Sequence, residues 1–394
     1  MSRPLIIQSI LDTDLYKLTQ QQAVLHGSGM GISYEEVNAG YEFINRANTP
    51  FPDGFADKVN EQVELMAGLA LTDSEYWWMR RTLPFLNRSY LDYLHGYRFD
   101  PDEVHVSQIG SELKITIKGP WYRTILWEVP LMAIVSELYS EETGTVDSEW
   151  EDRIHAKANY FDFHRLSFAE FGTRRRRSFF VQDSVVRIMS DECKYFIGTS
   201  NVFLAMKYGV KAIGTHAHEW FSAHAALFGY RLANFHALQA WVDEFQGDLG
   251  IALTDTFTTN VFFDAFGTKF AKLFDGVRHD SGCPLAFADK VVAHYRSLNI
   301  DPKMKTIIFS DGLNPEECKR IRDHVGDRIK CAFGIGTNLT NDCGHKALNM
   351  VIKLVEVKFR NHRINTVKLS DVPGKNTGDP NEIALCKSIY GLEA

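Results

Sequence analysis

Seven short apolar segments between Phe168 and Gly336 each end in a cluster of small or acidic polar residues. Helical stretches separate most of these segments, which is the rhythm of parallel strands joined by helices. The segments are 167–177, 195–201, 212–219, 250–257, 276–282, 306–312 and 332–338. Because parallel strands place their carboxyl ends on one side, the pattern predicts an α/β barrel whose polar clusters gather at one face.

The composition limits the classes of protein to which the chain can belong. A length of 394 residues and a hydrophobic content of 45% allow one large domain and a smaller one. The formal net charge of −7 argues against a nucleic acid or an anionic membrane as the main ligand. The six cysteines lie far apart without a CxxC pair, so we expect reduced thiols in a cytoplasmic protein. No apolar stretch approaches membrane-spanning length, and the early Asp12 and Asp14 argue against a signal peptide.

The first third of the chain has a different pattern from the rest. Residues 34–46 look like a strand or hairpin, and apolar alternation before and after a glycine turn predicts a second hairpin further on. The polar segment 141–152 indicates a boundary near residue 140. We therefore predict an N-terminal α+β domain over 1–140 and a catalytic barrel domain with a C-terminal segment over 141–394. Two strand-like segments within 349–372 are expected to pair and can return to the N-terminal sheet.

Four consecutive arginines, Arg174–Arg177, follow the first of the seven segments. Such a run can be a nucleic-acid or localisation patch, or the exposed start of a helix. Here it follows Phe171 and Gly172 at a predicted strand end, which directs at least the first arginine into the barrel mouth. A guanidinium group is a planar fork that suits a carboxylate or a phosphate. The residues alone leave an anion site and an exposed basic patch both open.

Two histidines, His216 and His218, lie on the same side of the third segment if the strand continues through them. They could bind a metal ion that His224 or Asp255 completes, and a barrel metallohydrolase would use His216, His218 and Asp255 as zinc ligands. The HExxH zinc motif is excluded, because Ser222 stands where its second histidine is needed. Alternatively, one histidine is a nucleophile or proton carrier oriented by Asp255. A third interpretation is a hydrogen-bonded structural histidine.

The last clusters suit a ligand with hydroxyl groups and phosphate. Arg278 offers a cation to phosphate, and Asp280 can accept contacts from hydroxyls or a metal ion. Gly334 and Gly336 let backbone N–H groups approach phosphate oxygens, and Thr337 adds a hydroxyl. Together these residues predict a site for a ribose phosphate and Mg²⁺.

Ten segments, in order along most of the chain, carry a family resemblance. They are LDTDLYKLTQQQAV (11–24), LWEVPL (126–131), FGTRRR (171–176), GTSN (198–201), GTHAHEWF (214–221), GIALTDTF (250–257), RHDSG (278–282), FSDGLN (309–314), FGIGT (333–337) and KLSDVPGK (368–375). They resemble the nicotinate phosphoribosyltransferase family of the type II phosphoribosyltransferase superfamily. The resemblance implies an irregular seven-stranded α/β barrel with an N-terminal α+β domain. It also implies an enzyme of NAD biosynthesis that makes nicotinate mononucleotide and pyrophosphate from nicotinate and phosphoribosyl pyrophosphate, coupled to ATP hydrolysis.

The same resemblance implies a role for each motif residue. Tyr16 and Phe171 would stack on the pyridine ring of nicotinate, an arrangement that suits a flat, electron-poor ring. Arg174 would bind the carboxylate of nicotinate, and Thr215 would line the base pocket. The residues that would bind phosphoribosyl pyrophosphate are Arg278, Asp280, Ser281, Asp311, Gly336 and Thr337, with Mg²⁺ on Asp280 and Asp311.

The implied catalytic residues are His218, Asp255 and Asp280. His218 matches the histidine that the family phosphorylates from ATP, so we expect a phosphohistidine there, and Asp255 matches its carboxylate partner. His216 lies where the family varies. Cys283 stands where relatives usually carry Asp or Asn, and a thiol cannot replace a carboxylate toward Mg²⁺. The expected ligands are nicotinate, phosphoribosyl pyrophosphate and ATP with Mg²⁺, without nucleic acid or membrane, in a monomer or a homodimer.

Overall fold

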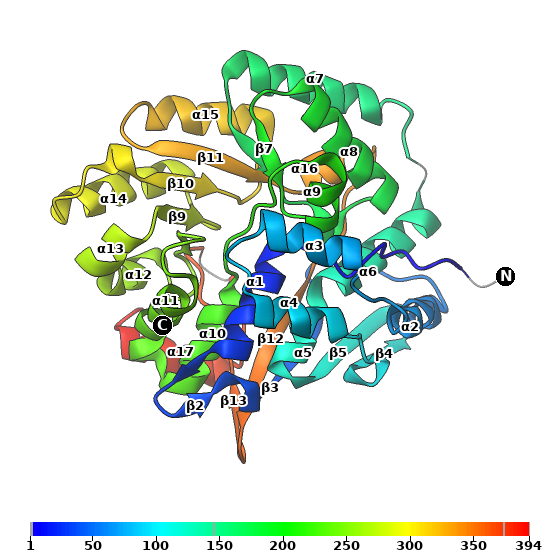
Figure 1. The fold of residues 1–394 in the computed structure, drawn as a ribbon, viewed down its shortest axis with the longest axis horizontal. Helices are drawn as coiled ribbons and strands as arrows, with labels where there is room; N and C mark the ends of the chain where they lie inside the picture. The colour runs from blue at the N-terminus through cyan, green and yellow to red at the C-terminus, as the bar shows by residue number, and fades with distance from the viewer. Residues whose placement is uncertain (1–2, 145, 373–374, 394) are drawn as a thin grey trace. The chain divides into compact units, whose positions relative to one another are not determined.

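The computed structural model describes residues 3–144, 146–372 and 375–393 (Figure 1). The chain forms two compact units, and each is built from separate stretches of sequence. Unit 1 consists of Met1–Leu25, Gly40–Gly214 and Ile335–Lys353, and unit 2 consists of His26–Ala39, Thr215–Gly334 and Leu354–Ala394. The division at residue 140 that the sequence indicates stays a prediction.

Unit 1 is a mixed α/β structure that contains an antiparallel sheet. Its strands are β3 (Val37–Asn45), β4 (Val104–Ile109) and β5 (Glu112–Pro120), with β3 beside β5. β4 and β5 form a hairpin whose register runs from Val104↔Ile117 to Ile109↔Glu112. Alternate residues of β5 are buried, because apolar side chains fall on one face of a pleated strand. The predicted hairpin is therefore confirmed, and Gly110 supplies the positive φ of 57° that its turn requires.

Helices and a parallel strand pair complete unit 1. The helices are α1 (Leu15–His26), α2 (Phe55–Met66), α3 (Asp73–Thr82), α4 (Arg88–Gly96), α5 (Trp121–Thr124), α6 (Glu128–Thr143), α7 (Trp150–His164), α8 (Phe179–Glu192), α9 (Val202–Tyr208) and α16 (Thr337–Thr340). The strands β6 (Phe168–Glu170) and β7 (Phe196–Thr199) pair in parallel, with Glu170 opposite Thr199. A short 3₁₀ helix, η3 (Thr173–Arg175), follows β6 and carries the first arginines of the run.

Unit 2 contains the parallel strands β8 (Ile251–Leu253), β9 (Gly276–His279), β10 (Thr306–Phe309) and β11 (Lys330–Ile335), side by side in that order. Its helices are α10 (His218–Phe228), α11 (Tyr230–Phe245), α12 (Thr259–Ala265), α13 (Thr268–Leu273), α14 (Pro284–Ser297), α15 (Pro315–Val325) and α17 (Pro380–Tyr390). Thr306 pairs with Gly276 on one side and with Lys330 on the other. The predicted alternation of parallel strands and helices is thus confirmed, whereas closure of the strands into a barrel stays a prediction.

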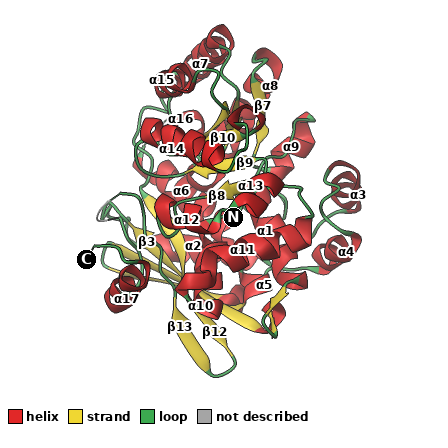
Figure 2. Ribbon diagram, turned by 90° about the vertical axis from the view of Figure 1, so that its left-hand side faces the viewer, coloured by secondary structure: helices red, strands yellow, loops and turns green. Residues whose placement is uncertain are grey.

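Two antiparallel pairs also belong to unit 2. One is the short pair β1 (Ser28–Gly29) and β2 (Ile32–Ser33). The other joins β12 (Met350–Phe359), whose first four residues belong to unit 1, to β13 (His362–Asn365), and Figure 2 shows the pair as a two-stranded ribbon. The predicted strand pairing within 349–372 is confirmed by the register Glu356↔Asn365 to Phe359↔His362.

The third predicted strand differs from the expectation. Only Ala212 pairs with a neighbouring strand, at Thr199, and helix α10 begins at His218. The strand therefore does not continue through His216 and His218. Glu219 lies in the first turn of α10, where a carboxylate favours a helix N-terminus, and the Trp220 N–H already donates to the Ala217 carbonyl at 3.1 Å.

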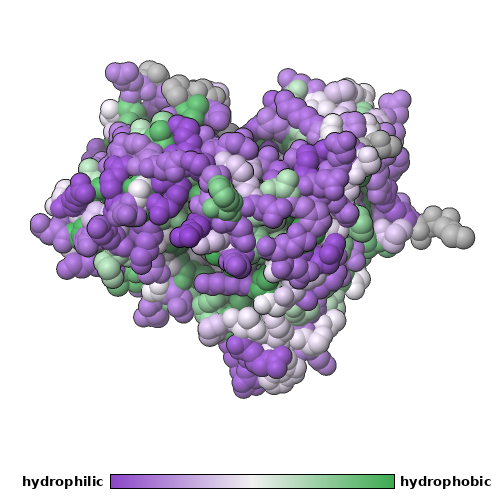
Figure 3. Space-filling view, turned by 90° about the horizontal axis from the view of Figure 1, so that it is seen from above, coloured by the Kyte–Doolittle hydropathy of each residue, from purple (hydrophilic) through white to green (hydrophobic). Residues whose placement is uncertain are grey.

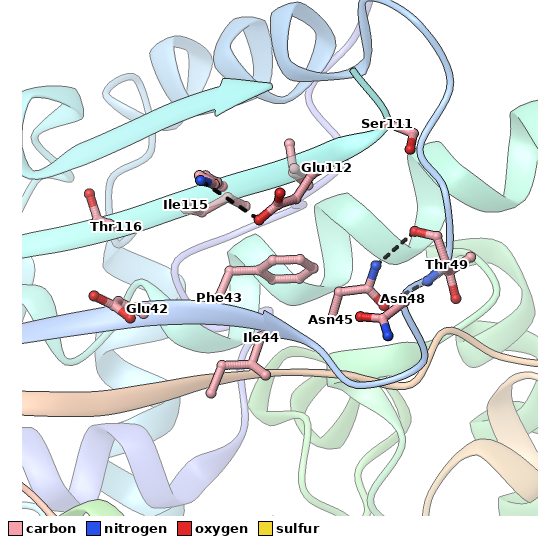
Figure 4. A pocket seen from close by; sticks show the side chains of 12 residues that line it. Glu42, Phe43, Ile44, Asn45, Asn48, Thr49, Ser111, Glu112, Ile115 and Thr116 are labelled. Atoms are coloured by element: carbon pink, nitrogen blue, oxygen red, sulfur yellow. Dashed lines mark hydrogen bonds and ion pairs between the residues drawn. The ribbon is translucent and has the colours of Figure 1, made fainter. Parts of the chain in front are cut away.

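Hydrophilic residues cover most of the face shown in Figure 3. Among the helices of the described residues, none combines the length and the apolar character needed to cross a membrane. Unit 1 also contains a hollow of about 640 Å³ over β3 and β5 (Figure 4), with walls formed by residues 42–45, 48–49 and 111–116. None of the residues that the sequence assigns to a site lines this hollow.

Candidate active site

The residues predicted to form the site fall into two clusters, one in each unit. The unit 1 cluster consists of Tyr16, Phe171, Arg174, Gly336 and Thr337. The unit 2 cluster consists of Thr215, His218, Asp255, Arg278, Asp280, Ser281 and Asp311. Each cluster has its own internal contacts.

Arg174 is the cation of the unit 1 cluster. Its guanidinium lies 5.9 Å from the centroid of the Tyr16 ring. The Nε atom is 3.7 Å from Asp14 Oδ2, and Nη1 is 3.8 Å from Glu128 Oε1. Both separations are longer than a hydrogen bond, and the Arg174 side chain is 36% exposed. The arrangement leaves a guanidinium beside an aromatic ring, where a ligand carboxylate can pair with it.

Three charged residues near Tyr16, namely Asp14, Lys17 and Glu128, are almost fully buried. Burial alone would raise the pKa of Glu128, but Lys17 and Arg174 together hold it below its usual value. Lys17 Nζ lies 2.5 Å from Glu128 Oε2. Burial raises the pKa of Asp14 despite the opposing charge of Arg174, while the Ser200 hydroxyl donates to Asp14 Oδ1 at 2.7 Å. These charged groups are therefore largely removed from water, and the electrostatic contacts between them are stronger than in water.

The second half of the arginine run is internal. Arg176 is fully buried and donates to both carboxylate oxygens of Asp12, at 2.7 and 3.0 Å. Arg177 is also buried and donates to the Ser140 carbonyl at 2.8 Å. The interpretation of the run as an exposed basic patch is wrong, because two of its four guanidinium groups are paired inside unit 1.

Glu170 is a buried carboxylate that the sequence interpretation did not single out. Its Oε2 accepts from the Thr199 hydroxyl at 2.6 Å and from Gln182 Nε2 at 3.1 Å. Its Oε1 accepts from the backbone N–H of Gly172. Burial raises the pKa of Glu170 to about 7, against the lowering effect of these donors. The signal in the sequence was an acidic residue at the end of an apolar strand, directly before the motif FGTRRR.

Arg278 organises the unit 2 cluster. Its Nη1 donates to Thr215 Oγ1 at 2.8 Å, and its Nη2 donates to Asp280 Oδ1 at 2.7 Å. Its Nε donates to Ser310 Oγ at 2.8 Å. The sequence interpretation did not assign a role to Ser310. Burial would raise the pKa of Asp280, but Arg278 and a hydrogen bond from His218 hold it well below its usual value. Asp280 is therefore a permanent anion fixed between a cation and a histidine.

His218 has hydrogen-bond partners on both ring nitrogens. Nε2 lies 3.1 Å from Asp280 Oδ2, and Nδ1 lies 3.0 Å from Thr256 Oγ1. Because an ionised carboxylate only accepts, Nε2 carries the proton and Nδ1 accepts from the Thr256 hydroxyl. Burial, aided by Lys368, lowers the pKa of His218 to about 4. The ring is therefore neutral at pH 7, with its lone pair on Nδ1.

Asp255 lies farther from His218 than Asp280 does. Its Oδ1 is 3.7 Å from His218 Nε2, while its Oδ2 accepts from the Ser281 hydroxyl at 2.6 Å. Lys368 Nζ lies 3.6 Å from the same Oδ2. Lys368 was not among the predicted site residues, although it begins the segment 368–375 that carries the family resemblance. Within the described residues, Asp255 Oδ1 is buried without a hydrogen-bond partner. An added cation or donor would satisfy this oxygen.

Three side chains could hold a cation in unit 2. His218, Asp255 and Asp280 each offer one ligand atom within 4.8 Å of the others. His216 is not part of this set, because its Nε2 accepts the Leu253 N–H at 3.0 Å and its ring packs against Trp241. The ligand set of the metallohydrolase alternative, which needs His216, is therefore not assembled.

The remaining predicted residues lie at element ends. Asp311 is exposed and lies two residues beyond the last residue of β10, and Cys283 is exposed at the N-cap of α14. Gly336 and Thr337 begin α16 in unit 1. A Cβ atom on Gly336 would lie 3.4 Å from the Phe171 carbonyl oxygen, which is close packing between two predicted site segments.

Comparison with known proteins identifies the family. A model described as the nicotinate phosphoribosyltransferase (NAPRTase) family matches residues 166–394, and the model of the NAPRTase N-terminal domain matches residues 11–136. A nicotinate phosphoribosyltransferase from Chromohalobacter salexigens is 50% identical over 392 residues, covering 98% of this chain and 99% of the relative. The chain belongs to the nicotinate phosphoribosyltransferase family.

Solved structures of the nicotinate phosphoribosyltransferase family agree with the fold. A crystal structure of the enzyme from Porphyromonas gingivalis matches with a TM-score of 0.95 and 43% identity, covering 98% of this chain and 100% of that one. A putative nicotinate phosphoribosyltransferase from Saccharomyces cerevisiae matches with a TM-score of 0.92 and 33% identity, covering both chains fully. The resemblance carried by the ten sequence segments is thereby confirmed.

The pKa of Glu170 gives a pH test. The unfolded chain loses this proton near pH 4.5 and the folded chain near pH 7, so the folded state binds one more proton between these values. Glu170 therefore adds to the free energy of unfolding below pH 4.5, and this contribution is lost as the pH rises through 7. The free energy of unfolding of the wild type, relative to that of Glu170→Gln, should fall by on the order of 3 kcal/mol over this window. Denaturant titrations at several pH values check this, and a difference independent of pH would contradict it.

Proposed function

We propose that this protein is a nicotinate phosphoribosyltransferase. It transfers the phosphoribosyl group of phosphoribosyl pyrophosphate to nicotinate and releases pyrophosphate and nicotinate mononucleotide, a precursor of NAD. The observation that carries the proposal is Arg174, whose guanidinium lies 5.9 Å from the centroid of the Tyr16 ring and whose side chain is 36% exposed. A cation beside an aromatic face suits a ligand that is both a flat ring and a carboxylate.

The finer architecture forms part of the same proposal. We propose that the parallel strands β6–β11 belong to the irregular seven-stranded α/β barrel of the family, with residues 1–140 as an N-terminal α+β domain and 141–394 as the catalytic domain. The parallel registers and the end of the N-terminal family model at residue 136 support this. We also propose a cytoplasmic location, which the six free cysteines support.

Base binding follows from the unit 1 cluster. Tyr16 and Phe171 stack on the pyridine ring, and Arg174 pairs with its carboxylate, so that the ring nitrogen is presented to the sugar. Nicotinamide lacks the negative charge and cannot form an ion pair with this guanidinium. Thr215, in unit 2, accepts a hydrogen bond from Arg278, and its role toward the base stays a prediction.

The sugar phosphate takes the unit 2 cluster, and the phosphate contacts of Gly336 and Thr337, in unit 1, stay a prediction. As pyrophosphate departs, positive charge develops at the sugar carbon, and the fixed anion Asp280 stabilises it without reorganising. Arg278 and Ser281 contact phosphate and hydroxyl oxygens. Asp280 and Asp311 would hold Mg²⁺, which offsets the charge of pyrophosphate when bound. Asp280 Oδ1 accepts from Arg278 and Ser310, whereas Oδ2 accepts from His218 and retains a lone pair that suits a divalent cation.

ATP acts as a co-substrate through His218. The Nδ1 lone pair attacks the γ-phosphorus of ATP, the P–O bond to ADP breaks, and an N-phosphoryl histidine forms. Nε2 keeps its proton, which stays hydrogen-bonded to Asp280, so the positive ring is stabilised by Asp280 and by Asp255 at 3.7 Å. Thr256 must turn its hydroxyl away from Nδ1 before attack.

Substrate preference tests the role of Arg174. The wild type should favour nicotinate over nicotinamide by about 10- to 150-fold, because a charge-assisted pair exceeds a neutral contact by about 1.5–3 kcal/mol. Arg174→Ala should lose most of this preference, and Arg174→Lys should keep part of it because the charge remains without the planar fork. Steady-state kcat/KM values for both bases measure the effect, with Arg187→Ala on the exposed side of α8 as the control. Equal turnover of both bases by the wild type would reject the assignment.

Phosphate labelling tests His218. ATP labelled at the γ-phosphate should transfer label to the protein, and the label should be acid-labile and alkali-stable. His218→Ala should lose the label, ATP hydrolysis and ATP stimulation but keep slow synthesis of nicotinate mononucleotide. Asp255→Asn should reduce labelling, and His362→Ala, at an exposed position of β13, should label normally. Normal labelling of His218→Ala would show that another residue is the acceptor.

A further inference from the structure

The turn between β6 and η3 carries Phe171 and Arg174 and is held on both sides of Gly172. The Gly172 N–H donates to Glu170 Oε1, and the Gly172 carbonyl accepts from Thr340 Oγ1 at 3.1 Å. A Cβ atom at position 172 would lie 2.1 Å from Thr340 Oγ1, so only glycine permits this approach. The backbone N–H and the carbonyl of Gly172 are thus both fixed by buried side chains.

Glu170 connects this turn to the residues on the far side of Arg174. Gln182 Nε2 donates to Glu170 Oε2 at 3.1 Å and to Thr173 Oγ1 at 2.9 Å. Gln182 Oε1 accepts from Arg176 Nη1 at 3.1 Å. The residues on either side of Arg174 therefore share one buried hydrogen-bond network, while the Arg174 side chain stays partly exposed.

The segment at α16 holds the turn from its other side. The Phe171 N–H donates to the Ile335 carbonyl at 2.8 Å, and the Arg177 N–H donates to the Thr340 carbonyl at 2.8 Å. Asn341 Nδ2 donates to the Arg175 carbonyl at 2.8 Å. The backbone from 171 to 177 is therefore tied to 335–341, the segment that includes Gly336 and Thr337.

We propose that Glu170 and Thr340 are positioning residues, which fix the Phe171–Arg174 turn for nicotinate binding by holding the N–H and the carbonyl of Gly172. This inference rests on the proposed function and adds two residues to it. Neither side chain reaches a ligand, because both are fully buried. They act through the backbone, which sets where the Phe171 ring and the Arg174 guanidinium lie.

The hydrogen-bond donors around Glu170 define an informative substitution. Three donors point at its two carboxylate oxygens: the Gly172 N–H, the Thr199 hydroxyl and Gln182 Nε2. Glu170→Gln keeps the size of the side chain but places an NH₂ group against at least one of these donors. The network must then rearrange, and the turn loses at least one of its ties.

The test compares Glu170→Gln and Thr340→Val with Glu137→Gln. Glu137 is the control, because its carboxylate accepts the Phe179 N–H at 2.9 Å and lies 3.7 Å from Arg176 Nε, and both of these partners lie outside residues 171–175. The KM for nicotinate should rise about 10- to 100-fold in Glu170→Gln and in the same direction in Thr340→Val, since small misplacements of binding groups have large effects. The KM for phosphoribosyl pyrophosphate should stay within about twofold in Glu170→Gln.

A second measurement needs no activity. Hydrogen exchange followed by mass spectrometry should show faster exchange of residues 171–177 in Glu170→Gln than in the wild type and in Glu137→Gln. If the wild type is active and the KM for nicotinate is unchanged in Glu170→Gln and Thr340→Val, the positioning inference is wrong and the proposed function stands. Equal rises in the KM of both substrates in Glu170→Gln would also overturn it, because they would indicate general damage. A wild type that forms no nicotinate mononucleotide would overturn the proposed function instead, while the exchange comparison still reports on the turn.

Discussion

The buried ion pair between Asp12 and Arg176 is the contact on which unit 1 depends most. Arg176 donates twice to Asp12, and Asn201 adds a third donor to the same carboxylate at 2.8 Å. All three side chains are fully buried, so removal of one partner would leave an uncompensated charge at a cost of about 3–5 kcal/mol. The pair joins the segment that leads into α1 and Tyr16 to the turn that carries Arg174. Through Gln182 it extends to Glu170, so the aromatic ring and the guanidinium of the cluster rest on one polar scaffold.

In unit 2, the ionised carboxylate of Asp280 lies beside the neutral ring of His218. Burial opposes charge on both groups, yet Arg278 stabilises Asp280 strongly enough to hold its carboxylate ionised. His218 remains neutral because burial and Lys368 outweigh the two carboxylates near it. A neutral imidazole with its proton directed at Asp280 has a free lone pair on the other nitrogen. That arrangement serves phosphoryl transfer and leaves Asp280 charged for the sugar chemistry.

Much of the fold, and the family, could be predicted from the sequence, because strand ends and motifs can be recognised in short stretches of residues. The parallel strands β8 to β11, the β4–β5 hairpin and the family were all predicted from such patterns. The errors and omissions depend on distant partners. The sequence pattern predicts one strand through His216 and His218, but helix α10 begins at His218. Glu170, Ser310 and Lys368 were missed because only the folded chain shows what they contact.

The most direct measurement is the identity of the product. Purified protein is incubated with nicotinate or nicotinamide, phosphoribosyl pyrophosphate and Mg²⁺, with and without ATP, and the products are identified by mass spectrometry. The account predicts nicotinate mononucleotide and pyrophosphate, faster with ATP, and little product from nicotinamide. Absence of any mononucleotide from nicotinate, or preferential conversion of nicotinamide, would contradict it.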